Sequence, residues 1–142
     1  MVKITNEYLI KKATSVINPK KTEDSLFGTV GCALLTEKGK VHLGVSIVTW
    51  SGMGFCAEHS AIAAMITNKE YKIKKIVALW QDEKGNSYIV PPCGRCREFM
   101  HRVDKDNLKT DIILAKNKTI KLKELLPYSE WSSLGIPYKP RL

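Results

Sequence analysis

The sequence contains no apolar run of about 18 residues, which is the length that a membrane-spanning helix requires. Charged residues such as Lys3, Glu7 and Lys11 interrupt its first apolar positions, so the N-terminus lacks the continuous core of a signal peptide. The four cysteines are too unevenly placed to form the disulfide framework of a secreted protein. We therefore expect a cytoplasmic protein with no membrane partner, whose thiols are available to a metal ion.

Arginine is scarce as well, although the chain is basic. The formal net charge is +9, but only four of the 23 basic residues are arginines, and the lysines are scattered along the chain. Nucleic-acid-binding surfaces usually concentrate charge on one face and use arginine for bidentate contacts. We interpret the lysines as a solvated surface that can attract small anions, and we do not expect nucleic acid to be the partner.

Length and composition indicate one soluble domain over residues 1–142. The apolar share of 44% and the charged share of 26% are those of ordinary globular proteins. Helical spacing of apolar residues predicts a first helix over residues 4–17, capped by Thr5 or Asn6. Further patterns predict helices over 56–68 and 93–103, and strands over 30–35, 41–48, 75–80, 88–90, 111–115 and 119–122.

Three of the four cysteines lie at the predicted starts of two helices. Cys56 opens one of them, and Pro92-Cys93-Gly94-Arg95-Cys96 opens the other. Where strands and helices alternate, successive helices on one side of a sheet begin at the same edge, so we expect these cysteines to meet. Helix N-termini favour thiolates, and three thiolates without an evident fourth ligand predict a zinc site with one position open to water. The fourth cysteine, Cys32, lies in an apolar run and is interpreted as a buried core residue.

Glu58 follows Cys56 by two residues, close enough to reach that water without being a ligand. This spacing matches zinc deaminases and predicts a general acid and base. Other interpretations stay open. A structural zinc site would require a fourth protein ligand, and a thioredoxin-like dithiol would leave Cys56 and Glu58 unexplained. A lone glutamate in a first helical turn most often only interacts with the helix dipole.

The chain resembles the cytidine deaminase superfamily, in particular the small nucleoside branch of cytidine deaminases and blasticidin-S deaminases. The resemblance rests on residues 30–34, 56–58, 92–97 and 124–127, and it covers nearly the whole chain in the right order. It implies a three-layer α/β/α fold with a mixed sheet of about five strands, a Zn²⁺ cofactor and a homotetramer. It also implies hydrolytic deamination of cytidine or deoxycytidine in pyrimidine salvage, with Glu58 moving the protons.

Two departures from this family concern charge and substrate. In cytidine deaminases an arginine often follows the glutamate; here that place is His59. We expect Arg95 to offset the thiolate charge, with His59 as the alternative. An asparagine and a glutamate that usually hold the ribose correspond to Ser46 and Val48, and valine cannot accept a hydrogen bond from a sugar hydroxyl.

The resemblance also supplies a set of pocket residues and two alternative functions. A C-terminal aromatic, Tyr128 or Trp131, is expected to cover the pocket. The pocket residues implied are Phe27, Ser46, Val48, Trp50, Ala57 and Trp131. The change at Val48 favours, as an alternative, blasticidin-S-type deamination of a cytosine nucleoside antibiotic. The alternative from another class is a non-catalytic, zinc-stabilised protein that binds nucleic acid through its lysines.

Overall fold

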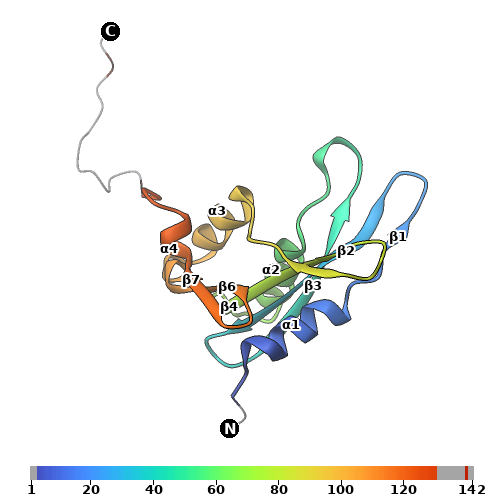
Figure 1. Ribbon diagram of the computed structural model, residues 1–142. Helices are drawn as coiled ribbons and strands as arrows, with labels where there is room; N and C mark the ends of the chain where they lie inside the picture. Colours follow the sequence, from blue (N-terminus) through green and yellow to red (C-terminus); the bar gives the residue numbers. More distant parts are fainter. Residues whose placement is uncertain (1–2, 131–139, 141–142) are drawn as a thin grey trace.

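A mixed β-sheet separates two layers of helix in the computed structural model, which describes residues 3–130 and residue 140 (Figure 1). The helices are α1 Asn6–Ser15, α2 Ala57–Thr67, α3 Gly94–Val103 and α4 Leu122–Leu125, with 3₁₀ turns at Trp50–Gly52 and Lys105–Lys109. The strands are β1 Lys20–Lys21, β2 Leu26–Thr36, β3 Val41–Val48, β4 Ile73–Gln81, β5 Ser87–Ile89, β6 Asp111–Ala115 and β7 Lys118–Lys121. No helix in the described part of the chain is long and apolar enough to cross a membrane.

The sheet has five main strands in the spatial order β3-β2-β4-β6-β7. Among the described pairs, β4 and β6 are parallel and the others are antiparallel, so the predicted mixed sheet is confirmed. Two short strands, β1 on β2 and β5 on β4, bring the sheet to seven strands rather than about five. The strand β1 was not predicted, because Lys20 and Lys21 pair through their backbone and carry no apolar pattern.

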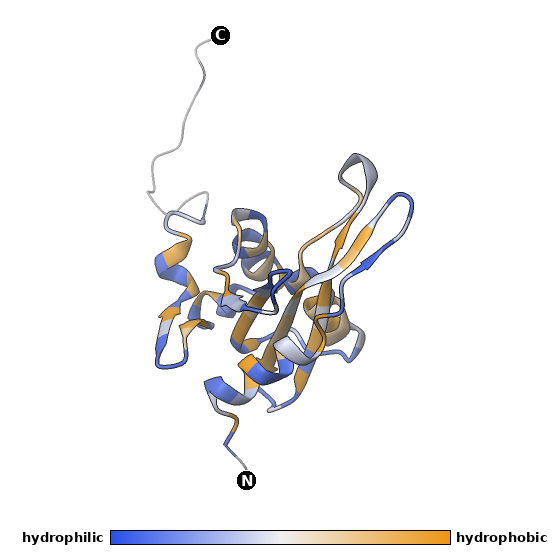
Figure 2. Cartoon of the chain, turned by 45° about the vertical axis from the view of Figure 1, so that its right-hand side comes forward, coloured by the Kyte–Doolittle hydropathy of each residue, from blue (hydrophilic) through white to orange (hydrophobic). Residues whose placement is uncertain are grey.

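The sheet is covered on both faces, as the predicted three-layer fold requires. On β2, Cys32 and Leu34 belong to the core beneath α2 and α3, whereas Ala33 and Leu35 belong to the core beneath α1. This alternation follows from the two-residue period of a strand. Because both faces of the sheet are covered, the strands consist largely of hydrophobic residues, as the orange segments of Figure 2 show. Cys32 has an exposed fraction of 0%, which agrees with its interpretation as a core residue.

Helix α1 lies within the predicted range. The backbone N–H of Tyr8 donates to Thr5 Oγ1 over 3.1 Å, so Thr5 is the cap. The helix ends at Ser15, two residues earlier than predicted, and its buried residues Leu9 and Ala13 pack on the sheet.

Helix α2 lies unusually close to β3, and a glycine allows this. A Cβ atom at Gly44 would lie 2.3 Å from the backbone nitrogen of Ala61, so any larger residue would push the helix away. The Ser60 hydroxyl donates to the Val45 carbonyl over 2.6 Å and fixes the same contact. The first turn of α2, which carries Glu58, is therefore held firmly against the sheet.

Candidate active site

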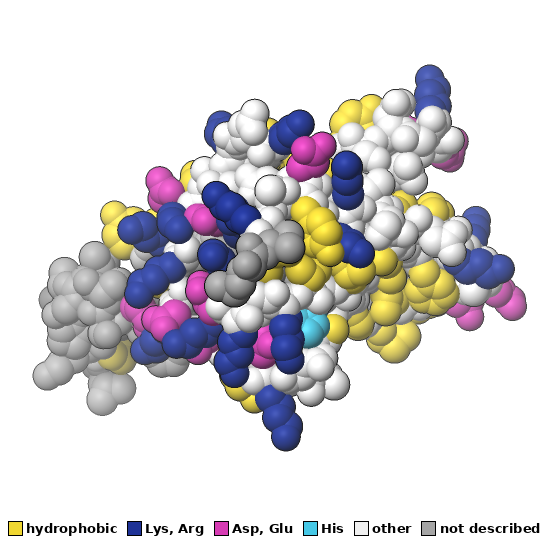
Figure 3. Space-filling view, turned by 90° about the horizontal axis from the view of Figure 1, so that it is seen from below, with side chains coloured by type: hydrophobic (Ala, Val, Ile, Leu, Met, Phe, Trp, Pro, Cys, Tyr) yellow, Lys and Arg dark blue, Asp and Glu magenta, His cyan; other side chains and the backbone are white. Residues whose placement is uncertain are grey.

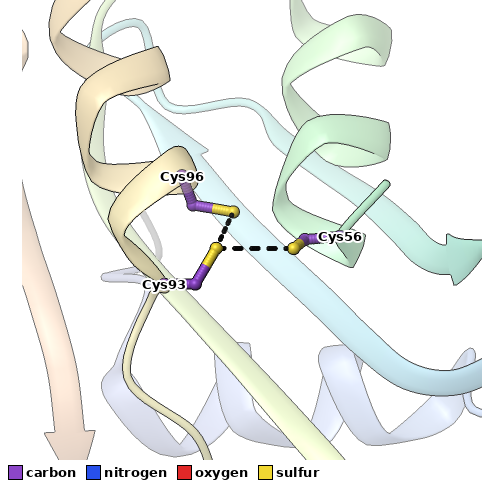
Figure 4. Close-up of side chains that lie close together, drawn as sticks. All are labelled: Cys56, Cys93 and Cys96. Carbon is purple, nitrogen blue, oxygen red and sulfur yellow. Dashed lines mark hydrogen bonds between the residues drawn. The ribbon is translucent and has the colours of Figure 1, made fainter. Parts of the chain in front are cut away.

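The structure brings three cysteine sulfurs together at the starts of α2 and α3 (Figure 4). Cys56 and Cys93 are the N-cap residues of the two helices, and Cys96 lies in the first turn of α3. The Sγ atom of Cys93 lies 3.6 Å from that of Cys56 and 3.5 Å from that of Cys96. The parallel placement of β4 and β6 explains this meeting, because both helices return across the same face of the sheet.

The geometry of this cysteine group fits a zinc ion. Tetrahedral zinc with Zn–S bonds of about 2.3 Å places neighbouring sulfurs about 3.8 Å apart, close to the two separations observed. Within the described residues, the group that could hold a metal contains these three cysteines and no fourth ligand. Three soft sulfur donors with one open position are the arrangement of a catalytic rather than a structural zinc site.

The surroundings of the sulfurs affect their protonation unequally. Burial, followed by the nearby Glu58 carboxylate, raises the pKa of the Cys96 thiol. Burial also raises the pKa of Cys56. The pKa of Cys93 is lowered despite burial, because the backbone N–H groups of Cys96 and Arg95 and the neighbouring thiols stabilise its thiolate. A divalent cation would offset the repulsion between three thiolates held this closely.

Among the residues that the structure describes in the lining of the adjoining pocket, Glu58 is the one carboxylate. Only 5% of its surface is exposed, and this burial raises the pKa of its carboxyl group. Hydrogen bonds with Cys96 and with its own backbone N–H oppose the shift without cancelling it. A carboxyl group with a raised pKa, next to a metal site, is suited to accept and then return a proton.

Of the two residues expected to offset the thiolate charge, His59 is the one whose side chain lies within hydrogen-bonding distance of a sulfur. Its Nδ1 atom lies 3.4 Å from Cys96 Sγ. The imidazole ring stacks on Phe99, with the ring centroids 4.3 Å apart and the planes 8° apart. Arg95 instead contributes its backbone N–H to Cys93, while its exposed side chain lines the pocket.

The pocket beside the cysteines has a volume of about 450 Å³. Of the residues predicted to line it, Ser46, Val48 and Ala57 do so. Phe27 lies outside the lining on β2, and Trp50 lies in an adjoining groove that shares Val48 and Thr49 with the pocket. Tyr128 is 81% exposed and is not in the lining. Trp131 falls outside the described residues.

Residues 3–110 match the family described as the cytidine and deoxycytidylate deaminase zinc-binding region. The chain belongs to this family. It is therefore a hydrolytic deaminase, and zinc is its cofactor, as the resemblance implied.

Individual relatives agree with this assignment. The chain is 33% identical to the cytidine deaminase of Mycoplasma genitalium in an alignment of 110 positions that covers 73% of this chain and 80% of that protein. It is 32% identical to the blasticidin-S deaminase of Bacillus cereus in an alignment of 105 positions that covers 69% of this chain and 74% of that protein. The crystal structure of cytidine deaminase from Mycobacterium tuberculosis has the same fold, with a TM-score of 0.71, 24% identity and coverage of 89% and 97% of the two chains.

Two further residues of the pocket wall in this deaminase, Ile47 and Phe55, were not predicted from the sequence. These two residues exchange backbone hydrogen bonds of 3.0 and 2.9 Å, so the segment before Cys56 folds back onto the end of β3. Gly54 is the available signal: a Cβ atom there would lie 2.2 Å from the Ile47 carbonyl oxygen. A glycine just before the first cysteine therefore indicates a close backbone approach.

A second residue without a predicted role, Arg97, supports the loop that carries Cys93. Its Nε donates to the Pro92 carbonyl over 2.8 Å, and its guanidinium donates to the Leu125 carbonyl over 3.2 Å. The guanidinium thus joins the loop before α3 to the last residue of α4. These two hydrogen bonds hold the segment over residues 124–127 next to the loop that carries Cys93.

Proposed function

We propose that this deaminase hydrolyses a free cytosine nucleoside, cytidine or deoxycytidine, to the uracil nucleoside and ammonia. The observation that carries the proposal is the placement of Glu58, a buried carboxyl group, beside three converging sulfurs in the wall of the pocket. A pocket of about 450 Å³ has the size of small-molecule sites. The relatives named cytidine deaminase support the choice of substrate.

Cys56, Cys93 and Cys96 would hold the zinc ion, whose contribution when bound is Lewis acidity that makes water nucleophilic near neutral pH. Glu58 accepts a proton from that water and delivers it to the ring nitrogen N3 as the oxygen adds to C4. The same carboxyl group then helps to protonate the amine, and ammonia leaves as the C4 carbonyl forms. Water is consumed and ammonia is released in equal amounts.

The test of this proposal is ammonia release by the zinc-loaded protein supplied with cytidine and, separately, with deoxycytidine. We expect steady turnover, with one uracil nucleoside formed for each ammonia released. Formation of the uracil nucleoside is measured by the loss of cytosine absorbance. The same protein without nucleoside provides the background. A protein that contains one zinc per chain and turns over neither nucleoside would contradict the proposal.

Blasticidin-S-type deamination is the second candidate, because Val48 gives the pocket an apolar wall and one relative is a blasticidin-S deaminase. It uses the same groups for the same chemistry, so a comparison of kcat/KM for the antibiotic and for cytidine distinguishes the two. The non-catalytic nucleic-acid-binding alternative is not retained, since the chain belongs to a family of deaminases. Lysine and arginine side chains are also dispersed, not gathered, on the face shown in Figure 3.

We also propose that the protein works as a homotetramer in the cytoplasm, in pyrimidine salvage. Trp50 and Met53, on the segment before Cys56, are 64% and 67% exposed and would supply apolar surface for contact with another copy of the chain. Light scattering is expected to give four times the mass of one chain. A monomeric mass in the active protein would exclude the tetramer.

A further inference from the structure

Helix α3 lies between the zinc site and the C-terminal part of the described chain. Its N-cap residue Cys93 and its first-turn residue Cys96 belong to the cysteine group. Residues 90–93 before the helix form the Cys93 loop, and residues 122–130 form the α4 segment, which consists of α4 and the residues that follow it. The side chains of α3 that contact this segment are Arg97, His101 and Arg102. One helix therefore contacts both parts of the chain.

Arg97 is the side chain that joins the Cys93 loop to the α4 segment. Its Nε donates to the Pro92 carbonyl over 2.8 Å, and its Nη1 donates to the Leu125 carbonyl over 3.2 Å. The Pro92 carbonyl belongs to the peptide group that leads directly into Cys93. The carbonyl of Cys93 itself accepts the backbone N–H of Arg97 over 3.0 Å. Two consecutive peptide groups at a zinc ligand therefore depend on one residue.

Two further contacts, later along α3, hold the end of the α4 segment. His101 Nε2 lies 3.0 Å from Glu130 Oε1, and only 2% of His101 is exposed, so this contact is made inside the protein. Arg102 Nη2 donates to the Ser129 carbonyl over 3.5 Å. At the other end of the segment, Leu122 is fully buried in the core beneath α2 and α3. The segment is thus attached at both ends, and Arg97 holds its middle.

The planar guanidinium of Arg97 makes the positions of its two carbonyl partners interdependent. A rigid fork that bonds two groups loses one bond when either group moves away. A metal ion that binds only the ordered Cys93 loop also stabilises every contact that requires this order. Zinc binding and attachment of the α4 segment are then thermodynamically linked, and such a linkage acts equally in both directions.

We infer that Arg97 is a positioning residue that couples retention of zinc to attachment of the α4 segment. Zinc orders the Cys93 loop, the loop fixes the guanidinium, and the guanidinium holds Leu125. Removal of zinc should therefore loosen residues 122–130, and loss of the Arg97 side chain should weaken zinc binding. The coupling goes beyond the proposed function, because it does not depend on which nucleoside is the substrate.

The zinc affinity of variant chains, measured by competition with a chromogenic chelator, tests the positioning role. Arg97→Gln should lower the affinity by about tenfold, at the low end of the range for residues that hydrogen-bond a metal ligand, because Arg97 acts on the backbone beside the ligand. Arg97→Lys keeps the charge but lacks the fork, so it should lose nearly as much. Arg102→Gln is the matched control. Arg102 lies on the same helix, its side chain bonds Glu98 and Ser129, and the control should bind zinc within about twofold of the wild type.

Hydrogen exchange with and without zinc tests the coupling itself. In the wild type, removal of zinc should accelerate exchange in the Cys93 loop and also in residues 122–130. Helix α1, whose core lies on the opposite face of the sheet, should not respond. In Arg97→Gln the α4 segment should exchange faster at the outset and should respond little to zinc. The thermal midpoint of unfolding shows separately that each variant is folded.

A zinc affinity of folded Arg97→Gln within about twofold of the wild type would overturn the positioning role. Exchange over residues 122–130 that is the same with and without zinc in the wild type would overturn the coupling, and this result needs no variant to fold. Failure of the proposed function looks different. A chain that turns over neither cytidine nor deoxycytidine can still show both effects of zinc.

Discussion

Replacing Glu58 by glutamine is expected to abolish measurable ammonia release while leaving the fold and the zinc content intact. Glutamine has nearly the same shape, and the site already holds Glu58 with only 5% of its surface exposed. The amide cannot accept a proton from water and return it to the substrate. General acid–base catalysis contributes about 10²- to 10⁴-fold, and we expect the upper part of this range because one carboxyl group would serve successive proton transfers in the proposed mechanism. The measurement is kcat with cytidine, together with zinc analysis and the circular dichroism spectrum.

Glu7→Gln is the matched control, since Glu7 also lies in the first turn of a helix but is exposed, on the opposite face of the sheet. This control should release ammonia at the wild-type rate. The two variants together separate catalysis from the ordinary favourable interaction of an acidic residue with a helix N-terminus. If Glu58→Gln retained more than half of the wild-type rate, Glu58 would have no part in the proton transfers.

Much of this fold could be predicted because its main elements carry their own patterns. The hairpin of β2 and β3 and the strands β4 and β6 are apolar runs, and α1 has both helical spacing and a threonine cap. The meeting of the cysteines followed from topology alone, since helices that return across one face of a sheet begin at one edge. The match to the family and to a solved cytidine deaminase of the same fold agrees with that prediction of fold.

The remainder of the site depends on contacts between residues that no local pattern connects. His59 meets Phe99, 40 positions later, and only the packing of α2 against α3 shows that its ring reaches Cys96. The position of Ser46 near the pocket could be predicted from the resemblance. Its hydrogen bond to the Val30 N–H could not, because Gly28, at φ 73° in the irregular stretch of β2, indicates an irregularity there but not which side chain satisfies the N–H group it frees.

Replacing Cys96 by alanine is expected to remove both zinc and activity. Its sulfur is fully buried between Cys93 and His59, and its loss leaves two sulfur ligands where three converge. Mutating a residue that only hydrogen-bonds to a metal ligand already lowers metal affinity by about 10- to 100-fold. Removing a direct ligand should therefore lower zinc affinity by more than that. Zinc measured after dialysis should fall from one ion per chain to a trace. Ammonia release should not return when zinc is added back.

Cys32→Ala is the control that distinguishes a ligand from a buried cysteine. Cys32 is as buried as Cys96, and it lies on the same side of the sheet, but it is not part of the cysteine group. This control should lose some thermal stability through a small cavity and should keep its zinc. After removal of zinc by a chelator, added zinc should restore ammonia release to the wild type and to Cys32→Ala. Stoichiometric zinc in Cys96→Ala would instead mean that Cys56 and Cys93 hold the ion without it, and Cys96 would then be a core residue like Cys32.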